Sequence, residues 1–302
     1  MGKFDGFNVI SADYKKVAGQ GIAVDLLIPS KLTAGLYPVI VRFHGGGYVS
    51  GSSLYEPWFP QWVLDLAIAK NAIIISPNYR LLPESSGLDI LEDLDDLRRW
   101  MKFGLNLKLS YFSTGLRADL DRIITQGDSA GGHLSIQFAW DHQEVKACIA
   151  LFPSLNLESP HFSGVNNTLP PGSISLVDQH LAHVGNIKPS SDMTLTRFPL
   201  ITAMIREGRF LEFFGINSRL FPFKTLEAGA KLPPLFILHG TDDTIVPVEG
   251  SKAFVKRLLE KNPDSKVVLT IQPGEHGVSA GFTMKHPWLV EGLKLVTDAW
   301  KA

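Results

Sequence analysis

The pattern Gly-Asp-Ser-Ala-Gly at residues 127–131 constrains the fold of this chain more than any other stretch. An apolar run at 122–126 precedes it and predicts a buried strand, and the run at 132–140 that follows can form a helix. Between a strand and a helix, Gly-x-Ser-x-Gly forms a sharp turn that lifts the serine hydroxyl above the sheet. A Cβ at either flanking glycine would clash in so tight a turn. We therefore predict that Ser129 is a nucleophile.

Apolar runs alternate with helical patterns along most of the chain. Continuous β-branched runs indicate strands that are covered on both faces, as in a parallel sheet. Strands alternating with helices predict an α/β fold with a mostly parallel central sheet flanked by helices. The expected strands lie at 22–28, 38–44, 72–76, 145–152, 234–238 and 266–271, and the expected helices at 88–101, 248–261 and 288–300.

The alternation breaks between residues 154 and 232. This stretch is rich in Ser, Asn, Pro and Gly at first, then shows patches of helical periodicity, and it holds six phenylalanines between 198 and 223. An insertion of this length with its own helices is more typical of a cap than of a linker. Most of the phenylalanines are expected to form the core of that cap. We therefore expect a catalytic domain of 1–153 and 233–302, and a cap or lid insertion of 154–232.

A serine hydroxyl is a weak nucleophile until an imidazole takes its proton, and a carboxylate must orient that imidazole. After Ser129 the chain offers His-Gly-Thr-Asp-Asp at 239–243, just past one expected strand, and Gly-Glu-His-Gly at 274–277, just past the next. The carboxyl ends of strands are where α/β folds place their chemistry. We predict that His276 is the base and that the other histidines, His239 among them, are structural or surface residues.

The carboxylate partner of His276 is one of two neighbours, Asp242 or Asp243. Composition does not choose between them. Side chains of adjacent residues in an extended loop point in opposite directions, so only one of them can face the imidazole. The other is expected near solvent or at the turn, where it can cap backbone groups. The residues alone therefore leave the identity of the acid open.

The attacked carbonyl develops negative charge, which needs hydrogen-bond donors already in place. The sequence His-Gly-Gly-Gly at 44–47 provides a glycine-rich backbone directly after a strand, and the amide of Ala130 is the usual complementary donor. A rival interpretation makes these glycines a dinucleotide phosphate loop. The next strand would then end at an acidic ribose ligand, but it ends at Asn78, and no helix clearly opens at the glycines. An oxyanion hole is therefore the favoured interpretation.

The expected helix at 88–101 carries a cluster of carboxylates opposite its apolar stripe. Such a cluster could suggest a metal site. The simpler interpretation is a solvated face on which Asp95 and Arg99 pair one turn apart. That face comprises Glu92, Asp93, Asp95, Asp96, Arg98 and Arg99. We therefore predict no metal site on this helix.

The net charge of −1 gives no indication of nucleic acid or an anionic membrane as a partner. The single cysteine, Cys148, excludes an intramolecular disulfide and is interpreted as a small buried hydrophobe. The first residues lack the apolar core of a signal peptide, and no apolar run approaches the length of a membrane span. We expect a cytoplasmic protein, and the sequence leaves its oligomeric state open.

Three motifs together resemble those of the hormone-sensitive-lipase-like branch of the α/β-hydrolase fold. They are His-Gly-Gly-Gly-Tyr at 44–48, Gly-Asp-Ser-Ala-Gly-Gly at 127–132 and the segment 78–84. The last is similar to the family's Asp-Tyr-Arg-Leu-Ala-Pro-Glu, with Asn78 and Leu82 as departures. In the family that segment shapes the core beside the site and is not catalytic. The resemblance runs from about residue 38 to 277, and the expected cap carries no family motif.

The resemblance implies a serine carboxylesterase that binds no cofactor or metal and acts on a small-molecule ester. It places the triad acid at the fifth residue of a stretch like 239–243, which selects Asp243. Ser129 would attack the ester carbonyl, His276 would shuttle the proton, and water would hydrolyse an acyl-enzyme. The oxyanion would accept hydrogen bonds from the amides of Gly46, Gly47 and Ala130.

Several substrates and reactions are compatible with these residues. The phenylalanine-rich insertion favours a small or medium apolar ester or lactone, since ligand pockets are largely apolar with few polar anchors. A different class is a non-hydrolytic cyclase or lyase of natural-product metabolism, because one fold can host several reactions. A third class is a ligand receptor with a degenerate triad. The complete order Ser, Asp, His disfavours the receptor.

Overall fold

The computed structural model describes residues 2–164 and 175–301. Within them one sheet contains the strands β1 (Phe7–Val17), β2 (Gln20–Pro29), β3 (Gly35–Phe43), β4 (Ile73–Pro77), β5 (Leu116–Asp128), β6 (Val145–Leu151), β7 (Leu235–Gly240) and β8 (Val267–Gln272). Their order is β1-β2-β4-β3-β5-β6-β7-β8. The β1–β2 and β2–β4 pairs are antiparallel, and every neighbouring pair from β4 to β8 is parallel. The mostly parallel sheet predicted from the sequence is confirmed.

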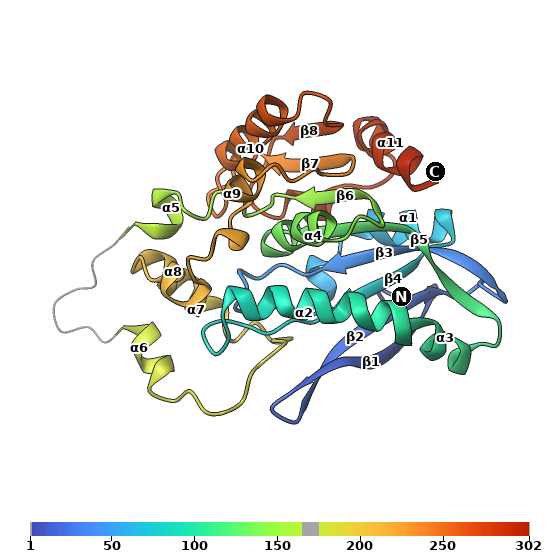
Figure 1. The fold of residues 1–302 in the computed structure, drawn as a ribbon, viewed down its shortest axis with the longest axis horizontal. Helices are drawn as coiled ribbons and strands as arrows, with labels where there is room; N and C mark the ends of the chain where they lie inside the picture. The colour runs from blue at the N-terminus through green and yellow to red at the C-terminus, as the bar shows by residue number, and fades with distance from the viewer. Residues whose placement is uncertain (1, 165–174, 302) are drawn as a thin grey trace.

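Helices cover both faces of this sheet (Figure 1). One face carries α2 (Gly87–Trp100), α4 (Ala130–Asp141) and α10 (Val248–Lys261), and the other carries α1 (Gln61–Lys70) and α11 (Pro287–Lys301). Side chains of β3 alternate between the two cores, with Val39 and Val41 in one and Ile40 in the other. This burial on both faces explains the continuous apolar runs of the strands. The predicted helices α2, α10 and α11 are confirmed to within one residue at each end.

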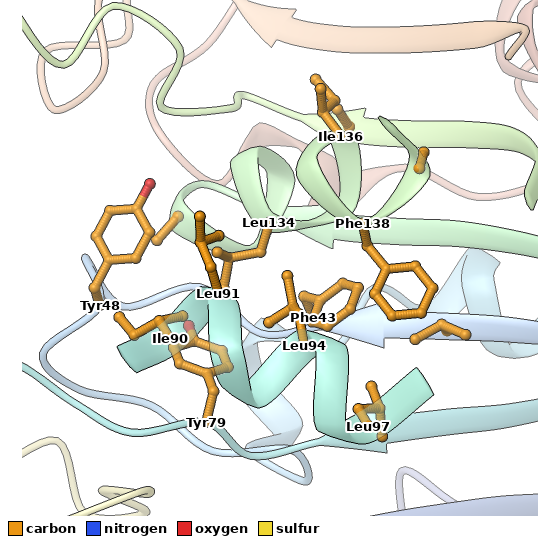
Figure 2. Packing of buried hydrophobic residues seen from close by; sticks show 14 of the residues in the cluster. Phe43, Tyr48, Tyr79, Ile90, Leu91, Leu94, Leu97, Leu134, Ile136 and Phe138 are labelled. Atoms are coloured by element: carbon orange, nitrogen blue, oxygen red, sulfur yellow. The ribbon is translucent and has the colours of Figure 1, made fainter. Parts of the chain in front are cut away.

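The helix that follows the serine turn, α4, is embedded in the larger core. Figure 2 shows Phe138 of α4 lying against Phe43 of β3, with Leu94 of α2 beside them. The ring centroids of Phe43 and Phe138 are 5.5 Å apart. Every residue of α4 except its last is buried, and burial of apolar area stabilises by about 25 cal/mol per Å². The burial of α4 therefore holds the helix in place directly after the end of β5.

The acidic face of α2 differs from the predicted solvated face. Asp93 is fully buried, and its carboxylate accepts hydrogen bonds from Arg80 Nε at 2.9 and 3.0 Å. Arg99 pairs with Asp96 at 2.6 Å instead of the predicted Asp95. The prediction was wrong for Asp93 because the guanidinium of Arg80 is itself buried beside the helix and needs a counter-charge. In the described part of the chain, no group of three or more His, Cys, Asp or Glu side chains could hold a metal ion.

The sequence did not indicate the first strand, β1. It lies at the edge of the sheet, and most of its side chains are exposed or half-buried, so its apolar pattern is weak. Other short elements were also missed: η1 (Glu56–Trp58), a π-helical turn η2 (Met101–Leu105), α3 (Asn106–Phe112), η3 (Ser218–Leu220) and η4 (Val278–Gly281). Each is too short to show a periodicity of its own.

The segment between β6 and β7 is built from short helices, α5 (Pro160–Ser163), α6 (Leu176–Leu181), α7 (Phe198–Arg206), α8 (Phe210–Phe214) and α9 (Pro222–Glu227). Residues 165–174 of the predicted insertion lie outside the described residues. In Figure 1, α5, α7 and α8 lie beyond the end of the sheet toward which β3, β6 and β7 point. Phe210, Phe214 and Phe221 are buried, and of these Phe214 and Phe221 fit the expectation of core phenylalanines.

Cys148 of β6 is buried, as predicted. Burial raises the pKa of its thiol to about 11, and the Sγ atom lies 3.5 Å from Ser135 Oγ. The thiol is therefore protonated at neutral pH and behaves as a small apolar group. As for membranes, none of the helices that the structure describes combines the length and apolar character that crossing a bilayer requires.

Candidate active site

The turn at Ser129 has strained backbone geometry. β5 ends at Asp128 and α4 begins at Ala130, and Ser129 joins them with φ 57° and ψ −119°. Such a conformation costs a non-glycine residue about 1–3 kcal/mol and persists only where the surroundings enforce it. A Cβ on Gly127 would lie 2.0 Å from the carbonyl oxygen of Gly131, and a Cβ on Gly131 would meet the β3 backbone at 2.1 Å. Both flanking positions therefore require glycine.

The loops after β7 and β8 bring Asp243 against His276. His276 Nδ1 lies 2.8 Å from Asp243 Oδ2. The other oxygen, Oδ1, accepts backbone N–H bonds from Ile245 at 3.0 Å and Val246 at 2.7 Å. Burial raises the pKa of Asp243, but hydrogen bonds from His239 and His276 outweigh burial and hold that pKa well below its usual range. The carboxylate is therefore ionised at neutral pH and accepts the Nδ1–H of His276.

Asp242 points away from this imidazole. Its Oδ2 accepts hydrogen bonds from the N–H of Gly274 at 3.0 Å and from Thr241 Oγ1 at 2.9 Å, and the residue is exposed. The two adjacent side chains thus point in opposite directions. Of the two candidate acids, the structure brings Asp243 into contact with His276.

His239 contacts the same carboxylate, whereas sequence analysis had interpreted it only as a structural or surface residue. Its Nε2 lies 3.2 Å from Asp243 Oδ2 and 2.8 Å from the carbonyl oxygen of Val246, while its Nδ1 lies 2.8 Å from Ser251 Oγ. When Nδ1 accepts from the serine, the Nε2–H donates to the carbonyl oxygen of Val246, and Asp243 Oδ2 lies beside this hydrogen bond. The one sequence signal was its place on β7, four residues before Asp243. Two imidazoles therefore contact this carboxylate.

A buried ion pair joins the serine turn to the glycine loop. Asp128 Oδ1 accepts a hydrogen bond from Arg42 Nη2 at 3.1 Å, and its Oδ2 accepts the N–H of Gly45 at 3.0 Å. Arg42 also donates to the carbonyl oxygens of Ser53 and Trp58, at 3.3 and 3.1 Å. Burial raises the pKa of Asp128, and the charge of Arg42 opposes that rise. The residue before the serine therefore positions the glycine loop.

The glycine loop itself is a tight turn. Gly46 and Gly47 have φ values of 108° and 62°, and the carbonyl oxygen of Gly46 accepts the N–H groups of Val49 at 3.1 Å and Ser50 at 3.0 Å. A Cβ on Gly46 would lie 2.1 Å from the carbonyl oxygen of Ser50. A Cβ on Gly47 would lie 2.6 Å from Ile201 Cγ1 of α7. Backbone conformation and close neighbours thus both select glycine here.

Aromatic residues support both ends of this loop. Tyr79 Oη donates to the carbonyl oxygen of His44 at 2.7 Å, and the two rings stack with centroids 4.3 Å apart. Tyr48 Oη lies 2.7 Å from His133 Nδ1. Burial lowers the pKa of both His44 and His133 to about 3, so both rings are neutral. Segment 78–84 therefore contributes to the core beside the loop.

Ser129, His276 and the glycines at 45–47 line one pocket of about 760 Å³. This volume falls within the range of small-molecule sites. The apolar walls come from η1, from the segments after β6 and β7, and from α5, α7 and α8. They include Trp58, Phe152, Leu157, Phe162, Phe198, Ile201, Ile205, Phe210, Ile245 and Val246. Of the six phenylalanines between 198 and 223, Phe198 and Phe210 face this pocket.

Asp192 and Arg197 tie the segment between β6 and β7 to the glycine loop. Ser50 Oγ donates to Asp192 Oδ2 at 2.9 Å, and Arg197 Nε donates to the carbonyl oxygen of Val49 at 2.9 Å. The other guanidinium nitrogens of Arg197 bind Glu84 at 3.0 and 2.5 Å. Burial raises the pKa of Glu84, but Arg197 outweighs it and lowers that pKa. No sequence motif marks these residues, so sequence analysis missed them.

Comparison with known proteins identifies the family. A family model described as the alpha/beta hydrolase fold matches residues 40–185. A "probable carboxylesterase" of a Phoma species is 31% identical over 314 residues, which span 99% of this chain and 98% of that protein. The chain belongs to the α/β-hydrolase family. Its resemblance to the hormone-sensitive-lipase-like branch is confirmed.

Two further comparisons are more distant. A non-reducing polyketide synthase of Preussia isomera is 26% identical over 296 residues, which span 86% of this chain but 13% of that much longer protein. A butyrate-bound thermophilic esterase of Thermogutta terrifontis is 21% identical, with a TM-score of 0.60 over 98% of this chain and 93% of that chain. The second likeness shows the shared fold.

We expect Asp128→Asn to lower the free energy of unfolding by about 3–5 kcal/mol, because it leaves the buried guanidinium of Arg42 without a counter-charge. Adding Arg42→Met to Asp128→Asn should recover part of the loss. Chemical denaturation of the variants measures both effects. Asp121→Asn, an exposed change on the same strand, is the control and should stay within about 0.5 kcal/mol of the parent. Equal losses for Asp128→Asn and Asp121→Asn would contradict the role of the ion pair.

Proposed function

We propose that this chain is a serine-dependent carboxylesterase that hydrolyses a small or medium apolar ester or lactone through an acyl-enzyme. The observation that carries the proposal is the 2.8 Å contact between Asp243 and His276. His276 lines the same pocket as Ser129. Membership of the α/β-hydrolase family and the carboxylesterase and esterase names of its relatives support it.

The proposed proton path follows from the tautomer of His276. Its Nδ1–H donates to ionised Asp243, which leaves Nε2 free to take the proton of Ser129 Oγ. As Oγ bonds to the ester carbon, the carbonyl electron pair moves onto the oxygen. The imidazolium then protonates the departing alcohol. Water attacks the resulting acyl-enzyme, with His276 again as base, and Ser129 leaves with its proton restored.

We propose that the amides of Gly46, Gly47 and Ala130 stabilise the oxyanion. Ala130 is the first residue of α4, so its N–H lacks an intrahelical acceptor and lies at the positive end of the helix dipole. The two glycines line the same pocket as Ser129, on the loop that Asp128 holds through Gly45. Donors fixed in advance cost little reorganisation when charge develops.

We propose that residues 154–232 act as a cap on a catalytic domain made of 1–153 and 233–302. The nucleophile and the base come from loops at the sheet, whereas α5, α7 and α8 contribute Phe162, Phe198 and Phe210 to the pocket wall. The catalytic groups then lie in the catalytic domain, and the cap contributes part of the apolar wall. Substrate choice would depend on the wall.

A second candidate function is that of a cyclase of natural-product metabolism, which would form the same acyl-enzyme but release it by ring closure. The match to a segment of a non-reducing polyketide synthase favours it. An internal nucleophile of the bound acyl group would attack the Ser129 ester and close a ring, and Ser129 Oγ would leave and take its proton back from His276. The released product separates the two candidates, since hydrolysis yields a free acid and cyclisation yields a ring.

We expect organophosphonates to label Ser129 covalently, because His276 can take its proton and the strained turn exposes its hydroxyl. Mass spectrometry of the treated protein locates the adduct, and Ser129→Ala should abolish both labelling and turnover of 4-nitrophenyl butyrate. Ser279→Ala changes another serine of the pocket and should leave the label on Ser129. An adduct at another residue, or none on active enzyme, would refute the assignment.

We expect Asp243→Asn to lower turnover near neutral pH by about 10⁴, because an amide in that position favours the wrong imidazole tautomer. Asp242→Asn is the matched control and should keep activity within about tenfold, since its carboxylate bonds to the Gly274 turn. Steady-state kinetics on folded variants, checked by circular dichroism, measure both. An inactive Asp242→Asn beside an active Asp243→Asn would reverse the assignment.

We expect Gly46→Ala to lower kcat by about 10²–10³, because the new Cβ would lie 2.1 Å from the Ser50 carbonyl oxygen and displace the donor loop. Gly19→Ala is the control for backbone strain: Gly19 also has positive φ, 81°, but a Cβ there meets nothing within 4 Å. Thermal unfolding and ester turnover are measured for both. Normal turnover by folded Gly46→Ala would make this glycine structural only.

A further inference from the structure

One face of α7 lines the pocket along the whole helix. The lining residues are Phe198, Ile201, Thr202, Ile205 and Arg206. Their spacing of three, four, seven and eight residues from the first places them on a single helix face. The other side packs inward, where Leu200 and Met204 are buried. Arg206, the last residue of α7, is therefore part of the pocket wall.

Arg206 is displaced from the glycine loop along this face. Ile201 marks the end near that loop, because a Cβ on Gly47 would lie 2.6 Å from Ile201 Cγ1. Arg206 follows five residues later, which corresponds to about 7.5 Å along the helix axis. An ester held with its carbonyl at the glycine loop can therefore extend along α7 and present its other end to the guanidinium.

The charge of Arg206 has no acidic partner among the described residues. Its neighbours are occupied: Arg209 binds Asp178 at 2.7 Å, and Glu207 accepts a hydrogen bond from Ser175 Oγ at 2.7 Å. Arg206 thus differs from the other arginine near this end of α7 in having its guanidinium free for a ligand.

Apart from histidines, the described pocket lining contains one acidic side chain, Asp128, and one basic side chain, Arg206. The charge of Asp128 is already balanced by Arg42, at 3.1 Å. The remaining wall is largely apolar, so a bound substrate meets one unbalanced positive charge. A guanidinium presents paired N–H donors that match the two oxygens of a carboxylate.

We propose that Arg206 binds a carboxylate of the substrate, so that the preferred ester is an apolar molecule with one anionic group remote from the scissile bond. One guanidinium balances one negative charge, which fits a carboxylate better than a doubly charged phosphate. This inference rests on the proposed esterase function and names the substrate class of that site.

The test compares kcat/KM for two matched pairs of esters. In the first pair, 4-nitrophenyl hexanoate and the 4-nitrophenyl monoester of adipate differ by a carboxylate on the acyl side. In the second pair, phenyl acetate and 3-carboxyphenyl acetate differ by a carboxylate on the alcohol side. In at least one pair, Arg206→Gln should lower the ratio of kcat/KM for the anionic ester to kcat/KM for the neutral ester at least tenfold, chiefly by raising KM for the anionic ester. Arg206→Lys should recover part of it, because it keeps the charge but loses the planar fork.

Arg117→Gln is the matched control. Arg117 on β5 is exposed and, like Arg206, has no acidic partner among the residues described, but it does not line the pocket. It should leave both ratios within twofold of the parent. An unchanged ratio in both pairs for Arg206→Gln, or an equal loss for Arg117→Gln, overturns the proposal. If Arg206 only stabilised the C-terminal end of α7, Arg206→Gln would lower thermal stability without changing either kcat/KM ratio, which also overturns the proposal.

Binding without turnover separates this proposal from the esterase proposal. The Ser129→Ala protein, with and without Arg206→Gln, is titrated by calorimetry with the amide analogues of both pairs. If binding of an anionic analogue weakens at least tenfold with Arg206→Gln while the parent protein, with Ser129 intact, turns over none of the esters, the carboxylate site is supported and the esterase is refuted. Turnover of the esters with no dependence of either ratio or of binding on Arg206 would refute the carboxylate site alone.

Discussion

The ion pair between Arg42 and Asp128 is the interaction on which the geometry of the site depends. Both side chains are almost entirely removed from water, which is costly unless each charge is well satisfied. Asp128 meets that condition by using its second oxygen for the N–H of Gly45. One carboxylate thereby fixes β3, the glycine loop and the serine turn relative to one another. Because Ser129 is the next residue, the hydroxyl and the loop cannot shift independently.

The features that could be predicted from the sequence follow from local rules or from chain order. A Cβ on Gly127 would lie 2.0 Å from the carbonyl oxygen of Gly131 within the same turn, so that part of the motif carries its own geometry, whereas a Cβ on Gly131 would meet the β3 backbone at 2.1 Å. The strands could be recognised because burial on both faces demands continuous apolar runs. Parallel strands place their carboxyl ends at one edge, so the loops bearing Asp243 and His276 gather there once the sheet is recognised.

The features that could not be predicted depend on partners distant in the sequence. Asp93 has the same pattern as the solvated carboxylates of α2, and only the fold places the guanidinium of Arg80 against it. Arg197 lies 148 residues from Val49, whose carbonyl it binds, in a segment without a motif. Helical spacing alone would not say which face of α7 meets a pocket, because both of its faces carry apolar residues.

The contact between Ile201 and Gly47 links the width of the pocket to the shape of the glycine loop. A side chain bulkier than Ile201 would narrow the cavity but also press on the backbone at Gly47, since the two already leave no room for a single added carbon. Selectivity and rate are thus coupled at this point of the wall. Evolution toward new substrates is less constrained at Phe198, which lines the same pocket, is partly exposed and packs on Trp58.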